Sequence, residues 1–483
     1  MTPGGILLDV SRLLARQDAD TPTGVDRVTL NYLLHFLDHP HWRLLAVTCS
    51  FGYVRTLDAA ELLALAQRLR TAWLPAHKLA LSSLHLPPPD SRTGDLHRVV
   101  TETGTLLCSG PLARVAANHQ FRWIYLNVSH DDVEVRAYMQ LLREALGLNV
   151  VIFVHDLIPI THPEFTGDGQ TEKHRRRLAN ALRMADLLLV NSRHTATELA
   201  AHAQEAGLAC PAIEPLTIGV EPLSTLPQAR DTLPGDLQHR PYFVVLGTIE
   251  PRKNHLLLLK IWQHLAEAGA QPMPVLVIVG KRGWKNAGVF ELLDHSAELQ
   301  THVMELSSVN DAELAALLTH CQALLFPSHV EGWGMPVLEA LSLGVPVICN
   351  DLPVFRESAG TAPLYLDIED LNGWQQAIME AAQGRREVQV PALPDWSQHF
   401  AALEELLRSL PPAPPVTLRL HPVTGPGRQV QAWLLVQAVT GIPERRLRQL
   451  RKLRNAPMQF LLDSALPPLR FLGSCWQRLR GAS

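Results

Sequence analysis

The sequence has few cysteines and no cysteine pair at the spacing of a metal or redox motif. Scattered cysteines without a C-x-x-C pair are typical of reduced thiols in the cytosol, and they argue against a disulfide framework or a zinc site. We therefore expect a cytoplasmic protein. The six cysteines are Cys49, Cys108, Cys210, Cys321, Cys349 and Cys475.

Long apolar runs are also absent. No stretch of about 18 apolar residues occurs, which is the length that a membrane-spanning helix needs. The first residues, MTPGGILLDVSRLLARQ, lack the basic and apolar regions of a signal peptide. A formal net charge of −4 argues against a dedicated nucleic-acid binder. We expect no transmembrane segment and no nucleic-acid partner.

Several catalytic motifs are missing as well. The sequence contains no Walker-type loop, no G-x-S-x-G elbow, no H-E-x-x-H pair and no G-x-G-x-x-G fingerprint. It also has no cluster of metal-ligand residues and no suitably placed D-x-D motif. We expect no cofactor and a metal-independent reaction.

What is present is the composition of a globular protein with more than one core. Of its 483 residues 47% are hydrophobic and 19% are charged, and two or three domains are expected at this length. Runs of Val, Ile and Leu alternate with helical stretches, which predicts an α/β protein with two doubly wound parallel sheets. The runs lie at 5–10, 43–49, 105–110, 149–156 and 185–192, and then at 242–248, 274–281, 323–328 and 345–351.

Breaks in this pattern suggest domain boundaries. Prolines and polar residues replace the periodic hydrophobic residues at 220–241, and the segment LPPAPP at 410–415 ends the second half. We predict domains at 1–220 and 221–395, followed by a helix at 396–410 and a tail at 411–483. The stretch LSSLHLPPPDSRTGD at 81–95 is expected to be a surface loop.

The stretch EGWGMPVLEALSLGVPVI, from Glu331 to Ile348, holds two glutamates eight residues apart. It predicts a loop, then a helix that begins at Met335 or Pro336 and ends at Gly344. Glu331 then precedes the helix N-terminus, and Glu339 lies about one turn inside it. Glycines in the loop let backbone N–H groups approach a ligand, and the positive end of the helix suits a phosphate. Either glutamate alone could equally be a solvated side chain.

The whole string resembles the E-x7-E signature of retaining glycosyltransferases of family 4, which have the GT-B fold of two Rossmann-like domains facing a cleft. The resemblance implies that Glu331 holds hydroxyls of the donor sugar and that Glu339 holds the nucleotide ribose. It places a short backbone segment near the sugar and diphosphate, formed by Gly332, Trp333, Gly334 and Met335.

The stretch LGTIEPRKNH (246–255) follows the first strand of the second half. Gly247 permits a tight turn, and Arg252 and Lys253 supply cations for a diphosphate leaving group. Relatives of this kind carry an arginine just after the glycine, where Thr248 stands here, so Arg252 is expected to supply that charge. The form GTxEPRKN looks like the branch that contains bacterial O-antigen mannosyltransferases.

A histidine ends a buried run in the first half, in VVIFVHDLIPITHPEF (150–165). His155 falls at the carboxyl end of a strand, where open α/β sheets bind ligands, although such a histidine often only satisfies buried backbone groups. Similar enzymes place an active-site histidine at this strand end in the acceptor domain, and the resemblance therefore implies a catalytic His155.

Further donor-site expectations come from the same resemblance. TPTGVDRVTL (21–30) looks like the glycine loop and first helix of such enzymes, with Gly24 near the diphosphate and Arg27 as a phosphate or acceptor contact. In VGKRGWKN (279–286), Lys281 could meet phosphate. ELSSVNDAELAALL (305–318) lies where backbone groups cradle the base, so Ser308 is expected at the donor site. Trp284 could pack near the nucleotide or belong to the core. NDLPVFRESAG (350–360) resembles the loop that closes the donor pocket, with Glu357 in a structural role.

The tail has a charge of its own. Residues 442–483 hold nine arginines and lysines against two acidic residues, whereas the rest of the chain is net acidic. Basic residues interleaved with leucines at PERRLRQLRKLRN predict helical structure that could lie on an anionic membrane. It could also dock on the acidic body or on a partner protein.

The resemblance implies a hexosyltransferase whose first domain takes a glycan or lipid-linked acceptor and whose second domain takes the nucleotide sugar, with the helix at 396–410 crossing back. GDP-mannose is the expected donor, in bacterial surface polysaccharide synthesis, at the inner face of the cytoplasmic membrane. Two alternatives stay open: a GT-B-type sugar-nucleotide epimerase, and a catalytically degenerate transferase that acts as an assembly partner.

Overall fold

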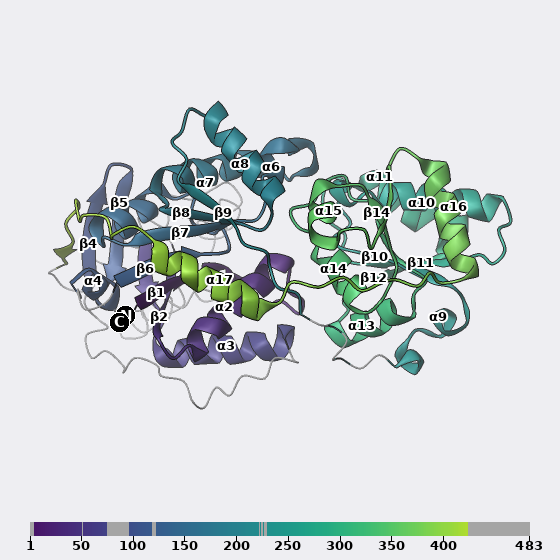
Figure 1. Cartoon of the computed structure of the whole chain (residues 1–483), viewed down its shortest axis with the longest axis horizontal. Helices are drawn as coiled ribbons and strands as arrows, with labels where there is room; N and C mark the ends of the chain where they lie inside the picture. The colour runs from purple at the N-terminus through teal and green to yellow at the C-terminus, as the bar shows by residue number, and fades with distance from the viewer. Residues whose placement is uncertain are drawn as a thin grey trace, which may run out of the picture.

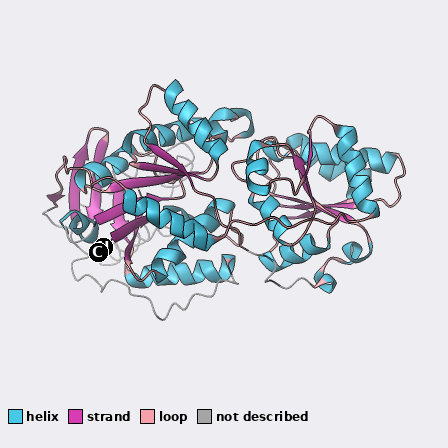
Figure 2. Ribbon diagram, viewed as in Figure 1, coloured by secondary structure: helices cyan, strands magenta, loops and turns pink. Residues whose placement is uncertain are grey.

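The computed structural model describes residues 4–423, apart from residue 51 and residues 75–95, 118–121, 222, 224–225 and 227–228. Within the described residues the chain forms two separate sheets, each with helices packed on both faces (Figure 1, Figure 2). The predicted fold class, two Rossmann-like domains with parallel sheets, is confirmed.

The first sheet runs in the order β16-β4-β5-β3-β2-β1-β6-β7-β8-β9. Its central strands are parallel, while β3, β4 and β16 add antiparallel pairings at one side. The strands are β1 (Gly4–Asp9), β2 (Trp42–Ser50), β3 (Tyr53–Thr56), β4 (Leu96–Thr101), β5 (Gly104–Ser109), β6 (Arg122–Asn127), β7 (Asn149–Val154), β8 (Leu187–Val190), β9 (Ala212–Pro215) and β16 (His421–Pro422).

Helices connect these strands and cover the sheet. The connections between parallel strands need helices because the chain must return to the same edge of the sheet. They are α1 (Ser11–Arg16), α2 (Gly24–Asp38), α3 (Ala59–Trp73), α4 (Gly110–Ala117), α5 (Arg136–Gln140), which continues as a π-helical turn (Leu141–Ala145), α6 (Ile158–Thr161), α7 (Gln170–Met184) and α8 (Arg193–Glu205).

The second sheet is entirely parallel, in the order β12-β11-β10-β13-β14-β15. Its strands are β10 (Tyr242–Leu246), β11 (Val275–Val279), β12 (Val303–Leu306), β13 (Leu324–Phe326), β14 (Val347–Asn350) and β15 (Leu364–Leu366). Its helices are α9 (Gly235–His239), α10 (His255–Glu267), α11 (Ala287–His295), α12 (Ala297–Gln300), α13 (Asp311–His320), α14 (Met335–Ser342), α15 (Pro353–Ala359) and α16 (Leu371–Gln383).

Each sheet has one point at which the strand order reverses direction. In the first sheet β1 lies between β2 and β6, and in the second β10 lies between β11 and β13. Loops leave the two strands of such a pair in opposite directions, which opens a crevice at their carboxyl ends. The two reversal points are called the N-terminal and C-terminal switch points below.

The last described helix, α17 (Trp396–Ser409), returns to the first domain and packs on α2 (Figure 1). His399 on α17 forms a 2.8 Å hydrogen bond with the hydroxyl of the buried Tyr32 on α2. The Trp396 ring lies so close to Gly219 that a Cβ at that position would meet its Cγ at 2.6 Å. Glycine at 219 therefore lets the two segments that link the domains pass each other.

Parts of the earlier expectations fall outside the described residues. These are the loop expected at 81–95 and the tail from residue 424 onward, including its basic segment. The described start of the tail, residues 411–423, contains no helix and instead adds the short strand β16 to β4. No helix among the described residues is long and apolar enough to cross a membrane.

Candidate active site

The C-terminal switch point brings Glu331 together with two cations. The loops after β10 and β13 lie side by side because these strands pair in the sheet. Glu331 Oε1 lies 2.5 Å from Lys253 Nζ, and Glu331 Oε2 lies 2.6 Å from Arg252 Nη1. The Glu331 and Lys253 side chains are each only 9% exposed. Three of the four residues that the sequence predicts as catalytic are therefore in direct contact.

Burial and charge compete in setting the ionisation of Glu331. Burial alone would raise the pKa of its carboxyl group, but the neighbouring Arg252 and Lys253 outweigh it and lower the pKa to about 2. Burial also lowers the pKa of the Lys253 ammonium group, and Glu331 opposes that shift. Glu331 is thus a carboxylate at any physiological pH.

Backbone geometry at Gly247 explains how Lys253 reaches this position. Gly247 has φ +136°, a left-handed conformation that other residues rarely adopt, and a Cβ there would meet Lys253 Cε at 3.0 Å. The Lys253 ammonium lies 4.4 Å from the centre of the Phe326 ring. The Thr248 methyl group instead faces the turn at Gly283, and a Cβ at Gly283 would approach it to 2.7 Å.

The helix predicted after Glu331 is observed as α14, and it begins at Met335. Its N-cap Gly334 has φ +86°, and a Cβ there would meet the Phe355 ring at 2.5 Å. Trp333 is 5% exposed, and its indole Nε1 has no hydrogen-bond partner among the described residues.

Glu339 lies inside α14 and is buried at 8% exposure. Burial raises the pKa of its carboxyl group, and Asp311 raises it further, whereas Arg27 lowers it. Arg27 comes from α2 in the first domain and forms two hydrogen bonds with Asp311, of 2.9 and 2.5 Å. An ion pair between the domains therefore lies beside Glu339, the residue predicted to hold the ribose.

The loop before α14 also touches the first domain. A Cβ on Gly332 would lie 2.7 Å from the carbonyl oxygen of His155 and 3.1 Å from Cβ of Asp156. Gly24 at the start of α2 faces Met335, whose sulfur would lie 3.3 Å from a Cβ at that position. Glycine at 332 is what allows the two domains to approach so closely at this point.

His155 follows β7 and is 6% exposed. Its Nε2 lies 2.8 Å from the carbonyl oxygen of Val128, and a carbonyl only accepts, so Nε2 carries the proton and donates. The backbone N–H of His155 donates to Nε2 of His130 over 3.2 Å. Burial lowers the pKa of the His155 imidazole. The ring is therefore neutral near pH 7, with its lone pair on Nδ1.

The N-terminal switch point holds residues that sequence reasoning did not find. Asp9 ends β1 and is fully buried, and one of its oxygens accepts hydrogen bonds from the hydroxyls of Tyr125 (2.8 Å) and Tyr138 (2.9 Å). Burial raises the pKa of Asp9 to about 6. Burial also raises the pKa of the nearby Asp132, which has φ +65°. The aspartate that ends the run GGILLD was the available signal.

The remaining residues singled out in the second domain have surroundings other than Glu331. Lys281 and Ser308 are exposed. Trp284 donates from its indole N–H to the Phe165 carbonyl in the first domain, over 2.9 Å. Glu357 also bridges the domains, because its carboxylate accepts from the backbone N–H of Arg193 at the start of α8, over 2.8 Å.

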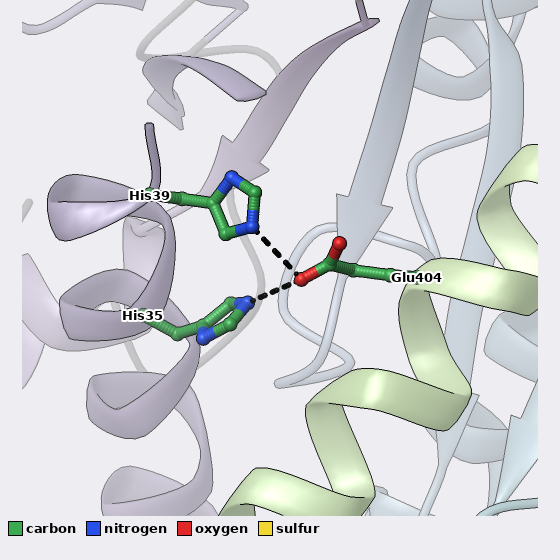
Figure 3. Close-up of side chains that lie close together, drawn as sticks. All are labelled: His35, His39 and Glu404. Atoms are coloured by element: carbon green, nitrogen blue, oxygen red, sulfur yellow. Dashed lines mark hydrogen bonds and ion pairs between the residues drawn. The ribbon is translucent and has the colours of Figure 1, made fainter. Parts of the chain in front are cut away.

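One group among the described residues has the composition of a metal site: His35 of α2, His39 at the C-terminal cap of α2, and Glu404 of α17 (Figure 3). Glu404 Oε1 lies 3.2 Å from His35 Nε2 and 3.0 Å from His39 Nε2. However, Nδ1 of His39 accepts from the backbone N–H groups of His41 and Trp42, so the proton of the neutral ring is on Nε2. A metal-ligating histidine normally donates its other N–H. Hydrogen bonds account for this cluster, which joins α17 to α2.

The second domain matches a known protein family. The family described as "Glycosyl transferases group 1" matches residues 234–363, a range that contains Gly247, Lys253, Glu331 and Glu339. Residues 234–363 form a group 1 glycosyltransferase domain. The family predicted from the E-x7-E string is confirmed for this part of the chain.

The similarity to known proteins covers more of this chain than the group 1 domain. The serotype-specific mannosyltransferase WbdA of Escherichia coli is 30% identical over 246 residues, which cover 49% of this chain and 30% of WbdA. The O-antigen chain mannosyltransferase B of Escherichia coli is 29% identical over 236 residues, covering 47% of this chain and 60% of that protein. The chain therefore matches less than two thirds of the length of each relative.

Solved structures agree with the fold. Anabaena HepE in complex with UDP and glucose is 17% identical, with a TM-score of 0.54 over 84% of this chain and all of that chain. Sucrose-phosphate synthase from Thermosynechococcus elongatus is 15% identical, with a TM-score of 0.52 over 84% of this chain and 98% of that chain. Both solved structures cover most of this chain, so the likeness in fold includes the first domain as well as residues 234–363.

Proposed function

We propose that this chain is a retaining glycosyltransferase that moves a hexose from a nucleotide diphosphate sugar to a hydroxyl group. The observation that carries the proposal is the arrangement around α14. A permanently ionised Glu331 lies before the helix next to Lys253, and Glu339 lies one turn inside it. Each lies where the domains meet: Gly332, next to Glu331, approaches His155, and Arg27 of the first domain acts on Glu339.

In the proposed complex the donor lies between the domains. Glu331 accepts hydrogen bonds from hydroxyls of the sugar, and Glu339 accepts from the ribose. The diphosphate lies against Lys253 and the backbone N–H groups at the start of α14, where the helix dipole favours negative charge. His155 accepts a hydrogen bond from a substrate hydroxyl on Nδ1, since its Nε2–H is already bound to Val128.

The proposed reaction is a front-face substitution. The bond from the anomeric carbon to the diphosphate oxygen breaks, and a bond to the acceptor oxygen forms on the same face, so the anomeric configuration is retained. The acceptor proton passes to an oxygen of the leaving diphosphate, whose growing negative charge Lys253 stabilises. Glu331 is already paired with two cations, which disfavours a role as a covalent nucleophile.

Mannose from GDP-mannose is the proposed donor, and a glycan or lipid-linked saccharide of a bacterial surface polysaccharide is the proposed acceptor. The support is the similarity to Escherichia coli proteins named as O-antigen mannosyltransferases. The form of the loop at Gly247–Asn254 is the part of the sequence that points to the same branch.

The proposal is tested by incubating the purified chain with labelled GDP-mannose, GDP-fucose, UDP-glucose and UDP-N-acetylglucosamine, and by following hydrolysis and transfer to a saccharide acceptor panel. We expect turnover of GDP-mannose, strongly reduced in Glu331→Ala and His155→Ala and normal in the control Glu291→Ala, which changes an exposed residue on α11. Near-normal rates in both site variants would remove these residues from the site.

A further inference from the structure

Arg252 has different surroundings from those of a phosphate ligand. Its Nε and Nη2 donate to Glu250 Oε1 over 3.1 and 2.7 Å. Its Nη1 donates to the Val330 carbonyl over 3.1 Å and pairs with Glu331 Oε2 at 2.6 Å. A guanidinium group has five N–H donors. Four of them are therefore engaged by the protein itself.

Lys253 contrasts with this neighbour. An ammonium group has three donors, and among the described residues Glu331 Oε1 is the hydrogen-bond acceptor that Lys253 Nζ contacts. Two N–H bonds are thus left for oxygens of a ligand. The two consecutive cations share Glu331, yet Lys253 keeps two donors that a diphosphate could use, whereas Arg252 keeps one.

Glu250 is the residue that sets this difference. Its side chain is 5% exposed, and it faces Arg252 from the turn that connects β10 to α10. The N–H of His329 donates to the carbonyl of Arg252 over 2.9 Å, which ties this turn to the loop after β13. Glu250, Arg252 and Glu331 form a chain of charge-assisted hydrogen bonds that ends at the carboxylate proposed to bind the sugar.

We propose that Arg252 is a positioning residue that fixes the Glu331 carboxylate, that Glu250 in turn fixes Arg252, and that Lys253 is the cation of this pair that contacts the diphosphate. This inference rests on the proposed function of the same site. It differs from the sequence-based expectation that Arg252 replaces the missing arginine at Thr248. A planar guanidinium holds two carboxylates in a fixed fork geometry, whereas an ammonium group is a point charge on a flexible chain.

The planarity of the guanidinium supplies a sharp test. If Arg252 acts as a point charge on the diphosphate, Arg252→Lys should retain most of the activity. If it bridges Glu250 and Glu331, the lysine variant should be as impaired as Arg252→Ala. We expect kcat for transfer to fall about 10- to 100-fold in both, and about 10-fold in Glu250→Gln, which keeps an acceptor oxygen but loses the charge.

Binding of the product separates the two cations. Isothermal titration calorimetry with GDP, UDP and ADP identifies the nucleoside diphosphate that the wild-type chain binds, and the variants are then titrated with it. We expect Lys253→Ala to raise its Kd by about 10-fold or more, and Arg252→Ala and Glu250→Gln to change it by less than about 3-fold. Arg55→Ala, at an ion pair with Glu61 in the other domain, is the control and should change neither quantity.

The outcomes are distinguishable. Equal loss of nucleotide affinity in Arg252→Ala and Lys253→Ala, or recovery of kcat in Arg252→Lys, overturns the inference and leaves the proposed function standing. A folded wild-type chain that neither binds any of the three nucleotides nor turns over a nucleotide sugar overturns the proposed function itself. Thermal melting of each variant excludes unfolding as the cause, and Glu250→Gln serves as the milder change if Arg252→Ala does not fold.

Discussion

At the carboxyl end of β13 the buried Glu331 lies between two cations, whereas at the carboxyl end of β1 the buried Asp9 faces two tyrosine hydroxyls. Both carboxyl groups are desolvated, which by itself raises a pKa. Ion pairing reverses the shift for Glu331, to about 2, and neutral donors do not reverse it for Asp9, at about 6. Two similar switch points thus hold carboxyl groups whose pKa values are shifted in opposite directions.

The two switch points also differ in the charged groups that they contain. A switch point with a fixed carboxylate and a lysine has a partner for hydroxyls and a partner for an anionic diphosphate. The N-terminal switch point holds Asp9 and Asp132 with raised pKa values beside neutral histidines, among them His130 and His155. Burial is the main cause of each of these pKa shifts, because it disfavours the charged form of a carboxyl group and of an imidazole alike.

The largest effect is expected where charge is essential. Glu331→Gln keeps the shape of the side chain but leaves Arg252 and Lys253 with one anion fewer, and we expect kcat for transfer to fall about 10²- to 10³-fold. Steady-state kinetics with labelled donor measures it. The neutral substitution Asp9→Asn is the matched change at the other switch point and should cost transfer far less. Equal losses would mean that the two sites do not differ as described.

The second effect concerns stability and pH. Because the pKa of Asp9 is about 6 in the folded chain and 3.8 in its reference state, the folded state binds an extra proton between these values. Stability therefore falls as pH rises from about 4 to 6, and the full cost is present above that range. Asp9→Asn should flatten this slope by about 1–3 kcal/mol in urea unfolding from pH 4 to 7.

The control for Asp9→Asn is Asp18→Asn, at an aspartate whose side chain is 77% exposed.

Glu331 contributes to the pH dependence of stability with the opposite sign, because its pKa is lowered from 4.5 to about 2. Its stabilisation is present above about pH 4.5 and is lost as pH falls toward 2. An Asp9→Asn chain with an unchanged slope would show that burial does not hold the Asp9 proton.

The third effect tests whether the two switch points act together. Gly332→Ala places a Cβ against the His155 carbonyl at 2.7 Å, so the domains must separate slightly. We expect about a 10-fold loss of transfer, because small displacements of reacting groups are costly. Gly288→Ala is the matched control, since a Cβ there meets nothing within 4 Å. Normal transfer in Gly332→Ala would separate His155 from the Glu331 loop in function.

The smallest effect is expected at the ion pair between the domains. Arg27 and Asp311 have side chains that are 12% and 15% exposed, and their removal breaks the ion pair that joins the domains beside Glu339. We expect Arg27→Ala and Asp311→Asn each to raise the donor KM about 3-fold, with a double variant no worse than either single one. Additive losses would show that the two residues act independently on the donor.

Much of this fold could be predicted from the sequence. All nine hydrophobic runs correspond to strands, since strands buried on both faces, such as β7, must be continuously apolar. Seven strands were missed: β3, β4, β6, β9, β12, β15 and β16. Strand β6 (RWIYLN) contains arginine, tryptophan, tyrosine and asparagine in place of a continuous run of Val, Ile and Leu, and β12 (VMEL) is only partly buried at the edge of its sheet.

The site was partly predictable for a related reason. The spacing of Glu331 and Glu339 is local, so the sequence alone placed one before α14 and the other inside it. Glu250 lies two residues from Arg252 in the same turn, whereas Glu331 could not be predicted as a partner, because only the pairing of β10 with β13 brings it to Arg252. Asp9 was missed because its tyrosine partners lie 116 and 129 residues away.

By itself, then, the sequence determined the two sheets, the loop and helix that carry the paired glutamates, and the glycines at the turns, because these depend on periodicity and local backbone freedom. The tertiary structure decided which charges meet, which carboxyl group is ionised and which domain surfaces touch. Those outcomes depend on burial and on distances between groups far apart in the chain, and no local pattern contains them.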